Sequence, residues 1–190
     1  MTAATDGAPM TVHTIGHSNR TLEDFIGLLR LEKLQSVVDV RAYPGSRRHP
    51  QFERAHLRHA LASSDINYVW KGQSLGGFRK GRLHSPHRAL TAESLRTYAD
   101  HMQTKEFRTA AAQLMALAGT TRLALLCAEK DPSHCHRSMI ADYLTAAGFR
   151  IIHLVAPGER LDHCLSVFAR QQGNELIYDG CEAAQLTLRI

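Results

Sequence analysis

The chain has 190 residues, of which 44% are hydrophobic and 22% are charged, and its formal net charge is +5 at neutral pH. These values are typical of a globular protein, and no Gly/Ser/Pro-rich linker divides the chain, so we expect a single domain over residues 1–190. No apolar run approaches the roughly 20 residues that span a bilayer. Residues 1–9 are small and polar, without the features of a signal peptide. We therefore expect a cytoplasmic protein with a disordered tail over residues 1–9 and no membrane association.

Hydrophobic periodicity predicts alternating strands and helices. We expect strands at residues 10–16, 36–40, 66–70, 123–127 and 150–155, with weaker strand signals at 176–178 and 186–188. We expect helices at about 21–33, 51–64, 91–118 with a break near 104–105, 135–144 and 161–172, the first of them starting at a Thr21–Asp24 capping pair. Strands joined by helices favour parallel pairing with right-handed crossovers. The sequence therefore predicts a three-layer α/β/α fold with a mostly parallel central sheet and an extra C-terminal strand.

The positive charge is concentrated in one segment. Residues 41–88 contain ten Lys or Arg and two acids, whereas the rest of the chain has more acids than bases. Residues 71–90, most of which belong to this segment, form a long glycine-rich connection that we expect to be a basic binding loop or lid. Such basicity favours an anionic partner, either a phosphate-bearing small molecule or nucleic acid, with an ordinary solvated surface as the alternative. Aromatic residues interleaved with these charges are either base-stacking groups or core residues, namely Phe52, Tyr68, Trp70 and Phe78.

Polar residues follow the predicted strands at their carboxyl ends, which share one edge of a parallel sheet and bind ligands in open α/β folds. The first strand ends at Gly16 and is followed by His17, and the second is followed by Arg41. A guanidinium half buried at a sheet edge requires a partner, which is Asp39, Glu129 or a ligand. The other expected groups at this rim are Ser18, Asn19, Ser46, Arg47, Cys127, Glu129 and His153.

Residues 123–144 are predicted to form a strand, a loop and a helix, and the loop holds an unusual number of chemically reactive side chains. Cys127 lies where strand-loop-helix enzymes place a nucleophile, but Arg137 follows it by ten residues, unlike the five-residue spacing of phosphatase and rhodanese loops. Arg137 at a helix start favours an anion held by the guanidinium and the helix N-terminus. The chain also offers ligand types for zinc or iron, although their spacing matches no standard pair: Cys127, Cys135, His134 and His136, with His17 or His153 as further candidates. Nucleophile, metal ligand and inert core cysteine stay open for Cys127.

Several motifs together resemble the bacterial and archaeal family known as domain of unknown function 488. They are TIGHSN at 14–19, VVDVRAYPGSR at 37–47, LGG at 75–77 and LLCAEKDPSHCHR at 125–137, and the resemblance extends from about Thr14 to Leu154. It implies an α/β fold and no established reaction. The family's motif residues fall on His17, Ser18, Asn19, Asp39, Arg41, Pro44, Ser46, Gly76, Gly77, Cys127, Glu129, Cys135, His136 and Arg137.

The leading hypothesis from the sequence is an enzyme that holds a phosphorylated or nucleotide-like anion at the rim. We expect the chemistry to come from His17, Cys127, Glu129 and His136, with His17 or His136 as general acid or base tuned by Glu129. The expected ligand contacts are Ser18, Asn19, Arg41, Ser46, Arg47, Gly76, Gly77 and Arg137. One alternative is a nucleic-acid-binding module that uses the basic segment, and another is a metal centre at Cys127, Cys135 and a histidine, with His136 as a candidate. The sequence indicates no particular cofactor or oligomeric state.

Overall fold

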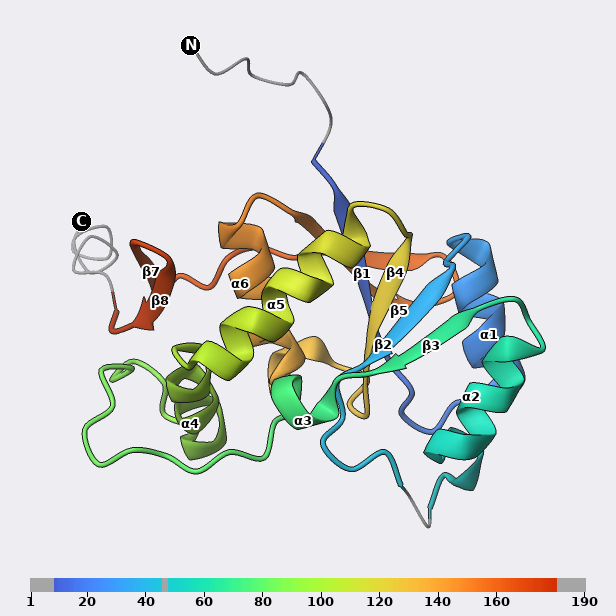
Figure 1. The fold of residues 1–190 in the computed structure, drawn as a ribbon, viewed down its shortest axis with the longest axis horizontal. Helices are drawn as coiled ribbons and strands as arrows, with labels where there is room; N and C mark the ends of the chain where they lie inside the picture. Colours follow the sequence, from blue (N-terminus) through green and yellow to red (C-terminus); the bar gives the residue numbers. More distant parts are fainter. Residues whose placement is uncertain (1–8, 46–47, 181–190) are drawn as a thin grey trace.

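The structure is a computed structural model that describes residues 9–45 and 48–180. A central sheet with the strand order β3-β2-β4-β1-β5-β6 has helices on both faces (Figure 1). Its first five strands in chain order are parallel, and the sixth pairs antiparallel with the fifth. The predicted three-layer fold with a mostly parallel sheet is therefore confirmed. The strands are β1 (Thr11–Gly16), β2 (Ser36–Asp39), β3 (Asn67–Trp70), β4 (Leu123–Cys127), β5 (Arg150–Ala156) and β6 (Glu159–Asp162).

Helices cover the sheet because successive residues of its inner strands are apolar and point to opposite faces. Val37 and Leu126 belong to the core under one pair of helices, whereas Val38 and Leu125 belong to the core under the helices of the other face. The first pair is α1 (Leu22–Leu31) and α2 (Arg54–Ala62). The second face carries α4 (Glu93–Met102), α5 (Lys105–Ala118) and α6 (Arg137–Ala146), with the short α3 (Gly72–Leu75) beside them.

Side-chain caps explain where two of these helices begin. The Thr21 hydroxyl accepts the backbone N–H of Asp24 and donates to its carboxylate, which is the expected capping pair. Thr104 caps α5 by accepting the N–H of Phe107, so the helical region 91–118 breaks at the predicted place. Both caps satisfy donors that a helix leaves open at its first turn.

The C-terminal part differs from the expectation. Residues 161–172 are not helical but contain the end of β6 and the strand β7 (Ala169–Gln172), which forms a hairpin with β8 (Glu175–Tyr178). Tertiary pairing overrides the helical spacing here, because β6 adds to the edge of β5 and Arg150 forms an ion pair with Asp162. The strand expected at 176–178 is present as β8, and it pairs with β7 instead of the central sheet. The strand expected at 186–188 and residues 1–8 of the expected tail lie outside the described residues.

The basic connection 71–90 contains α3 and otherwise runs without helix or strand toward α4. It passes beside the carboxyl-end edge of the sheet (Figure 1). Within the described residues, no helix has the length and apolar character needed to cross a membrane.

Candidate functional site

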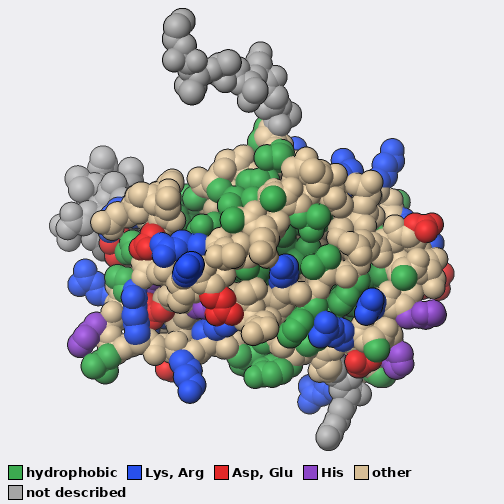
Figure 2. All heavy atoms as spheres, in the orientation of Figure 1, with side chains coloured by type: hydrophobic (Ala, Val, Ile, Leu, Met, Phe, Trp, Pro, Cys, Tyr) green, Lys and Arg blue, Asp and Glu red, His purple; other side chains and the backbone are tan. Residues whose placement is uncertain are grey.

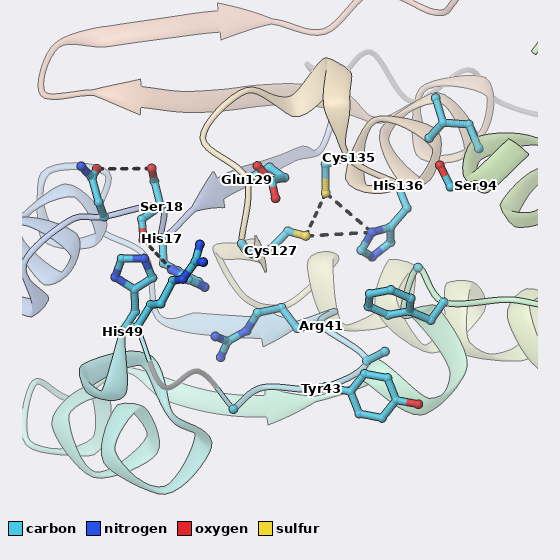
Figure 3. Close-up of a pocket in the computed structure, with 18 residues that line it drawn as sticks. His17, Ser18, Arg41, Tyr43, His49, Ser94, Cys127, Glu129, Cys135 and His136 are labelled. Atoms are coloured by element: carbon cyan, nitrogen blue, oxygen red, sulfur yellow. Dashed lines mark hydrogen bonds between the residues drawn. The ribbon is translucent and has the colours of Figure 1, made fainter. Parts of the chain in front are cut away.

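A pocket of about 620 Å³ opens at the carboxyl-end edge of the sheet (Figure 3). The edge gathers several loops because β1, β2 and β4 are neighbours, with Gly16 of β1 opposite Cys127 of β4. The N–H groups of His17 and Ser18 donate to the carbonyls of Cys127 and Ala128. These bonds fix the loop after β1 against the loop after β4. The expected site residues on its wall are His17, Ser18, Asn19, Arg41, Gly77, Cys127, Glu129, Cys135 and His136.

The floor of the pocket holds a cluster of two thiols and an imidazole, hereafter the Cys–His cluster of Cys127, Cys135 and His136. The two sulfur atoms are 2.8 Å apart, and Nδ1 of His136 lies 3.9 Å from Sγ of Cys127 and 3.6 Å from Sγ of Cys135. Cys127 ends β4, while the other two residues lie just before α6. The loop 128–136 therefore folds back so that residues eight and nine positions apart share one point.

The opposite ring nitrogen of His136 fixes its orientation. Nε2 lies 3.2 Å from the carbonyl oxygen of Val40, and since a carbonyl only accepts, Nε2 carries the proton. In the neutral ring, the lone pair of Nδ1 then faces the two sulfur atoms. Gly77 lies against this ring, because a Cβ at position 77 would be 2.6 Å from Nδ1. His136 is thus held from two sides.

The surroundings of the two thiols shift their pKa values in opposite directions. A hydrogen bond from Cys135 is the main reason that the pKa of Cys127 lies well below its usual value despite burial, and the neighbouring His136 and Arg137 lower it further. The hydrogen bond to Cys127 and burial raise the pKa of Cys135. Of the two, Cys127 is therefore the thiol that ionises first, and thiolates are the nucleophilic and metal-binding form of cysteine.

Arg137 acts from behind the pocket instead of on its wall. Its side chain is 1% exposed, and Nη2 donates to the carbonyl of Lys130 at 3.1 Å. The guanidinium also lies close to Gly16, where a Cβ would be 3.0 Å from Nη1 and only 1.7 Å from the carbonyl oxygen of Glu129. Only glycine fits at position 16. Burial lowers the pKa of Arg137, and the two neighbouring cysteines oppose this effect.

The partner of Arg41 is Asp39. Two nitrogens of the guanidinium donate to the carboxylate, Nε at 2.9 Å and Nη2 at 2.6 Å, and Nη1 donates to the carbonyl of Phe52 at 3.0 Å. The hydroxyl of Tyr68 donates to the same carboxylate at 2.7 Å. Arg41 lines the pocket with a guanidinium whose orientation is fixed, and whose charge is balanced, by Asp39.

His17 is an imidazole that the fold keeps neutral. Its ring stacks on Phe52 with centroids 4.5 Å apart, and Nδ1 lies 2.9 Å from the carbonyl oxygen of Ser18. Burial lowers the pKa of His17 to about 4, so at neutral pH the ring can act as a base but not as a charge. Ser18, the next residue, has a φ of 49°, which lies in the left-handed region.

Some expected residues do not reach the pocket. Gly76 packs against Ala42, where a Cβ would meet its backbone. His153 lies within β5, and its Nδ1 is 2.7 Å from the hydroxyl of Thr14, away from the pocket wall. Ser46 and Arg47 lie outside the described residues.

The pocket wall also holds residues outside the expected site set, of which Phe78 was a base-stacking candidate and Tyr43, Arg48 and His49 were not singled out. Tyr43 and Phe78 stand on the pocket wall with 76% and 78% of their surfaces exposed, and their ring centroids are 5.7 Å apart. Arg48 and His49 line the same pocket. Tyr43 belongs to the motif after β2, and its position between Arg41 and Pro44 is the only signal in the sequence that could have found it.

A family model described as "Domain of unknown function DUF488" matches residues 21–144. No curated protein and no solved structure matches the chain significantly.

Proposed function

The chain belongs to the domain of unknown function 488 family, and from the chemistry of its own pocket we propose that it is an enzyme acting on a nucleotide-like anion. The observation that carries the proposal is the combination of three kinds of group around one cavity. Cations and imidazoles line it, two exposed aromatic rings stand on its wall, and a reactive Cys–His cluster forms its floor. Phosphate, a planar base and a reacting bond would each find a matching group.

The charge on the pocket wall favours a phosphate. The exposed Arg48 lies on it, Arg41 lies there already paired with Asp39, and Glu129 is the one acid among the wall residues that the structure describes. Arginine binds phosphate oxygens with two parallel N–H groups, which makes it a strong phosphate ligand. The exposed cation on the pocket wall therefore supports an anionic substrate.

The aromatic pair favours a ring on that substrate. Tyr43 and Phe78 have large aromatic side chains that are exposed to water, whereas most such side chains in proteins are buried in the core. Nucleobases stack on exposed aromatic faces, and each stack contributes about 1–3 kcal/mol to binding. A nucleotide would place its base on this pair and its phosphate near Arg48.

The reacting groups would be those around the Cys–His cluster. Cys127 supplies an ionisable sulfur, His17 a neutral imidazole and Glu129 a carboxylate on the same wall. In Figure 3, Glu129 lies above Cys127 and His17 lies to its left. General acid or base chemistry needs such groups within reach of the bond that reacts.

Calorimetric titration tests the proposal. Nucleoside monophosphates should bind more tightly than the matching nucleoside or ribose 5-phosphate alone, and incubation followed by mass spectrometry should detect a product. Arg48→Ala should weaken phosphate-bearing ligands about tenfold, whereas Arg58→Ala, an exposed arginine away from the pocket, should have no effect. Failure of every nucleotide to bind, or equal binding by Arg48→Ala, would refute the proposal.

The nucleic-acid alternative has less support. Several cations of the basic segment are used within the fold: Arg41 binds Asp39, Arg82 pairs with Asp100, and Arg79 donates to backbone carbonyls. On the face drawn in Figure 2, Lys and Arg side chains are interspersed with acids. Nucleic-acid binding stays a prediction, and a steep loss of oligonucleotide affinity with added salt would favour it.

A further inference from the structure

The Cys–His cluster has the donor set of a metal site. Its three ligand atoms lie within 4.8 Å of one another, and no other group of three such ligands was found within the part of the chain that the structure describes. Thiolate and imidazole together favour zinc over magnesium or calcium, which prefer oxygen. Two cysteines and one histidine are also a ligand set that catalytic zinc sites use.

The separation of the sulfur atoms is compatible with metal binding. At 2.8 Å the sulfurs are too far apart for a disulfide, whose bond is about 2.05 Å. On a tetrahedral zinc with bonds of about 2.3 Å, two sulfurs lie roughly 3.8 Å apart. Zinc binding would therefore increase the distance between the two sulfur atoms by about 1 Å. Small rotations of the two cysteine side chains can provide this change.

His136 is oriented as metal-binding histidines usually are. A zinc-binding imidazole commonly donates its remote N–H to a carbonyl or carboxylate, which fixes the tautomer and aims the other nitrogen at the metal. Here Nε2 donates to the carbonyl of Val40, and Nδ1 faces the two sulfurs. The carbonyl of Val40 thus orients His136 in the way that such an acceptor orients a metal-binding histidine.

The charge near the cluster supports ionised thiols. Arg137 is buried, and its Nε and Nη1 have no hydrogen-bond partner in the structure. A buried guanidinium without full pairing is costly unless negative charge lies close by. The backbone N–H of Arg137 also points to Sγ of Cys135 at 3.4 Å. When they bind zinc, Cys127 and Cys135 are thiolates, and their sulfur atoms keep partial negative charge beside this cation.

We propose that Cys127, Cys135 and His136 bind one zinc ion whose fourth coordination position opens into the pocket. All three residues line the pocket, so one side of the cluster faces the cavity. A structural zinc has four protein ligands, whereas a catalytic zinc keeps one position for water or substrate. The metal binding stands on the cluster alone, and only the contact between metal and nucleotide rests on the proposed function.

Metal content and cobalt spectroscopy test this inference on the full chain. The protein is reduced, freed of metal by a chelator and titrated with Zn²⁺ alone, and it should retain about one equivalent after desalting. Replacement by Co²⁺ should give the visible bands of a tetrahedral site and a near-ultraviolet thiolate-to-cobalt band. Cys135→Ser should weaken zinc binding by more than about 100-fold, beyond the effect of substitutions outside the ligand shell.

Control variants assign the metal to the cluster. The chain has four cysteines, and Cys164→Ser combined with Cys181→Ser leaves only the two of the cluster, so this variant should bind zinc like the natural chain. Absence of zinc uptake by the reduced protein, or a cobalt spectrum without the thiolate band, would overturn the inference even if Cys135→Ser fails to fold. Zinc binding without nucleotide binding would overturn the proposed function alone, and nucleotide binding without zinc would overturn this inference alone.

Discussion

Gly77 and His136 are in such close contact that no side chain fits between them. A Cβ at position 77 would lie 2.6 Å from Nδ1 of His136, the nitrogen that faces the two thiols. Gly77→Ala should therefore push the imidazole away from its position and lower the free energy of unfolding of the metal-free protein by about 1–3 kcal/mol. If the cluster binds zinc, the dissociation constant should also rise by about 10–100-fold. Urea unfolding and zinc competition with a chromophoric chelator measure the two effects.

Gly27→Ala is the matched control for this change. Gly27 lies in α1, and a Cβ there would meet nothing within 4 Å. Alanine in a helix is more stable than glycine by roughly 0.5–1 kcal/mol. The control should therefore be neutral or slightly stabilising with unchanged zinc affinity. Equal behaviour of the two variants would show that Gly77 has no special relation to His136.

Asp39 should be among the most sensitive positions in the fold. It is fully buried and accepts hydrogen bonds from Arg41 and Tyr68. Asp39→Ala leaves the Arg41 guanidinium buried without its counter-ion, and breaking a buried pair on one side costs about 3–5 kcal/mol. Chemical denaturation should detect this loss in the free energy of unfolding.

The exposed pair of Arg150 and Asp162 provides the comparison for Asp39. Its bonds are as short as those of the buried pair, with Nε of Arg150 2.7 Å from the carboxylate, but both side chains are more than half exposed. Solvent screens such pairs, so Asp162→Ala should change stability far less than Asp39→Ala. Similar losses in both variants would mean that burial does not determine the strength of the Asp39–Arg41 pair.

The sequence predicted the parallel sheet and the rim because these depend on local patterns. Apolar runs such as residues 123–127 and polar residues directly after them are visible without any tertiary information. The same reasoning placed His17, Arg41 and Cys127 on one edge, and the structure brings them to one pocket. It failed for residues 161–172, where a helical spacing was overridden by pairing with β5.

Side-chain partners were harder to predict, since they depend on how loops fold back. Arg137 was expected at an anion, but the loop after β4 covers it and leaves it behind the Cys–His cluster. The closeness of Cys127 and Cys135 follows from the path of the same loop and from no spacing rule. Tyr43 and Phe78 belong to segments 35 residues apart, and only the tertiary fold brings their rings together.

The stability of the fold should fall in mild acid because of a buried histidine network away from the pocket. Nε2 of His153 is 3.0 Å from His163, which is 3.0 Å from Asp142. Burial, followed by the charges of His163 and Arg137, lowers the pKa of His153 to about 4, whereas the unfolded value is about 6.5. The unfolded chain therefore binds more protons between these values, and stability is lost as the pH falls through this window.

His153→Gln isolates this contribution. Between pH 7 and pH 5 the natural protein should lose about 1–2 kcal/mol more unfolding free energy than the variant, although the variant starts from a lower value. The measurement is urea unfolding in the presence of EDTA, which removes any contribution from metal. His84→Gln, at an exposed position, should keep the pH dependence of the natural chain. An unchanged slope in His153→Gln would exclude His153 as the source.

The exposed rings of Tyr43 and Phe78 should determine the preference for a base. Tyr43→Ala and Phe78→Ala should each weaken nucleoside monophosphate binding by about 1–3 kcal/mol, because a stacking surface is lost. Ribose 5-phosphate has no base, so its weaker affinity should stay unchanged in both variants. Isothermal titration with the two ligands separates the effects.

Phe168→Ala controls for the loss of an exposed aromatic ring elsewhere. Phe168 is 48% exposed and lies between β6 and β7, outside the pocket wall. Its replacement should leave both affinities unchanged, since it has no contact with the cavity. If Tyr43→Ala and Phe78→Ala weaken both ligands equally, the rings shape the pocket without holding a base. The substrate would then be an anion without an aromatic ring, and Arg48 would remain its expected contact.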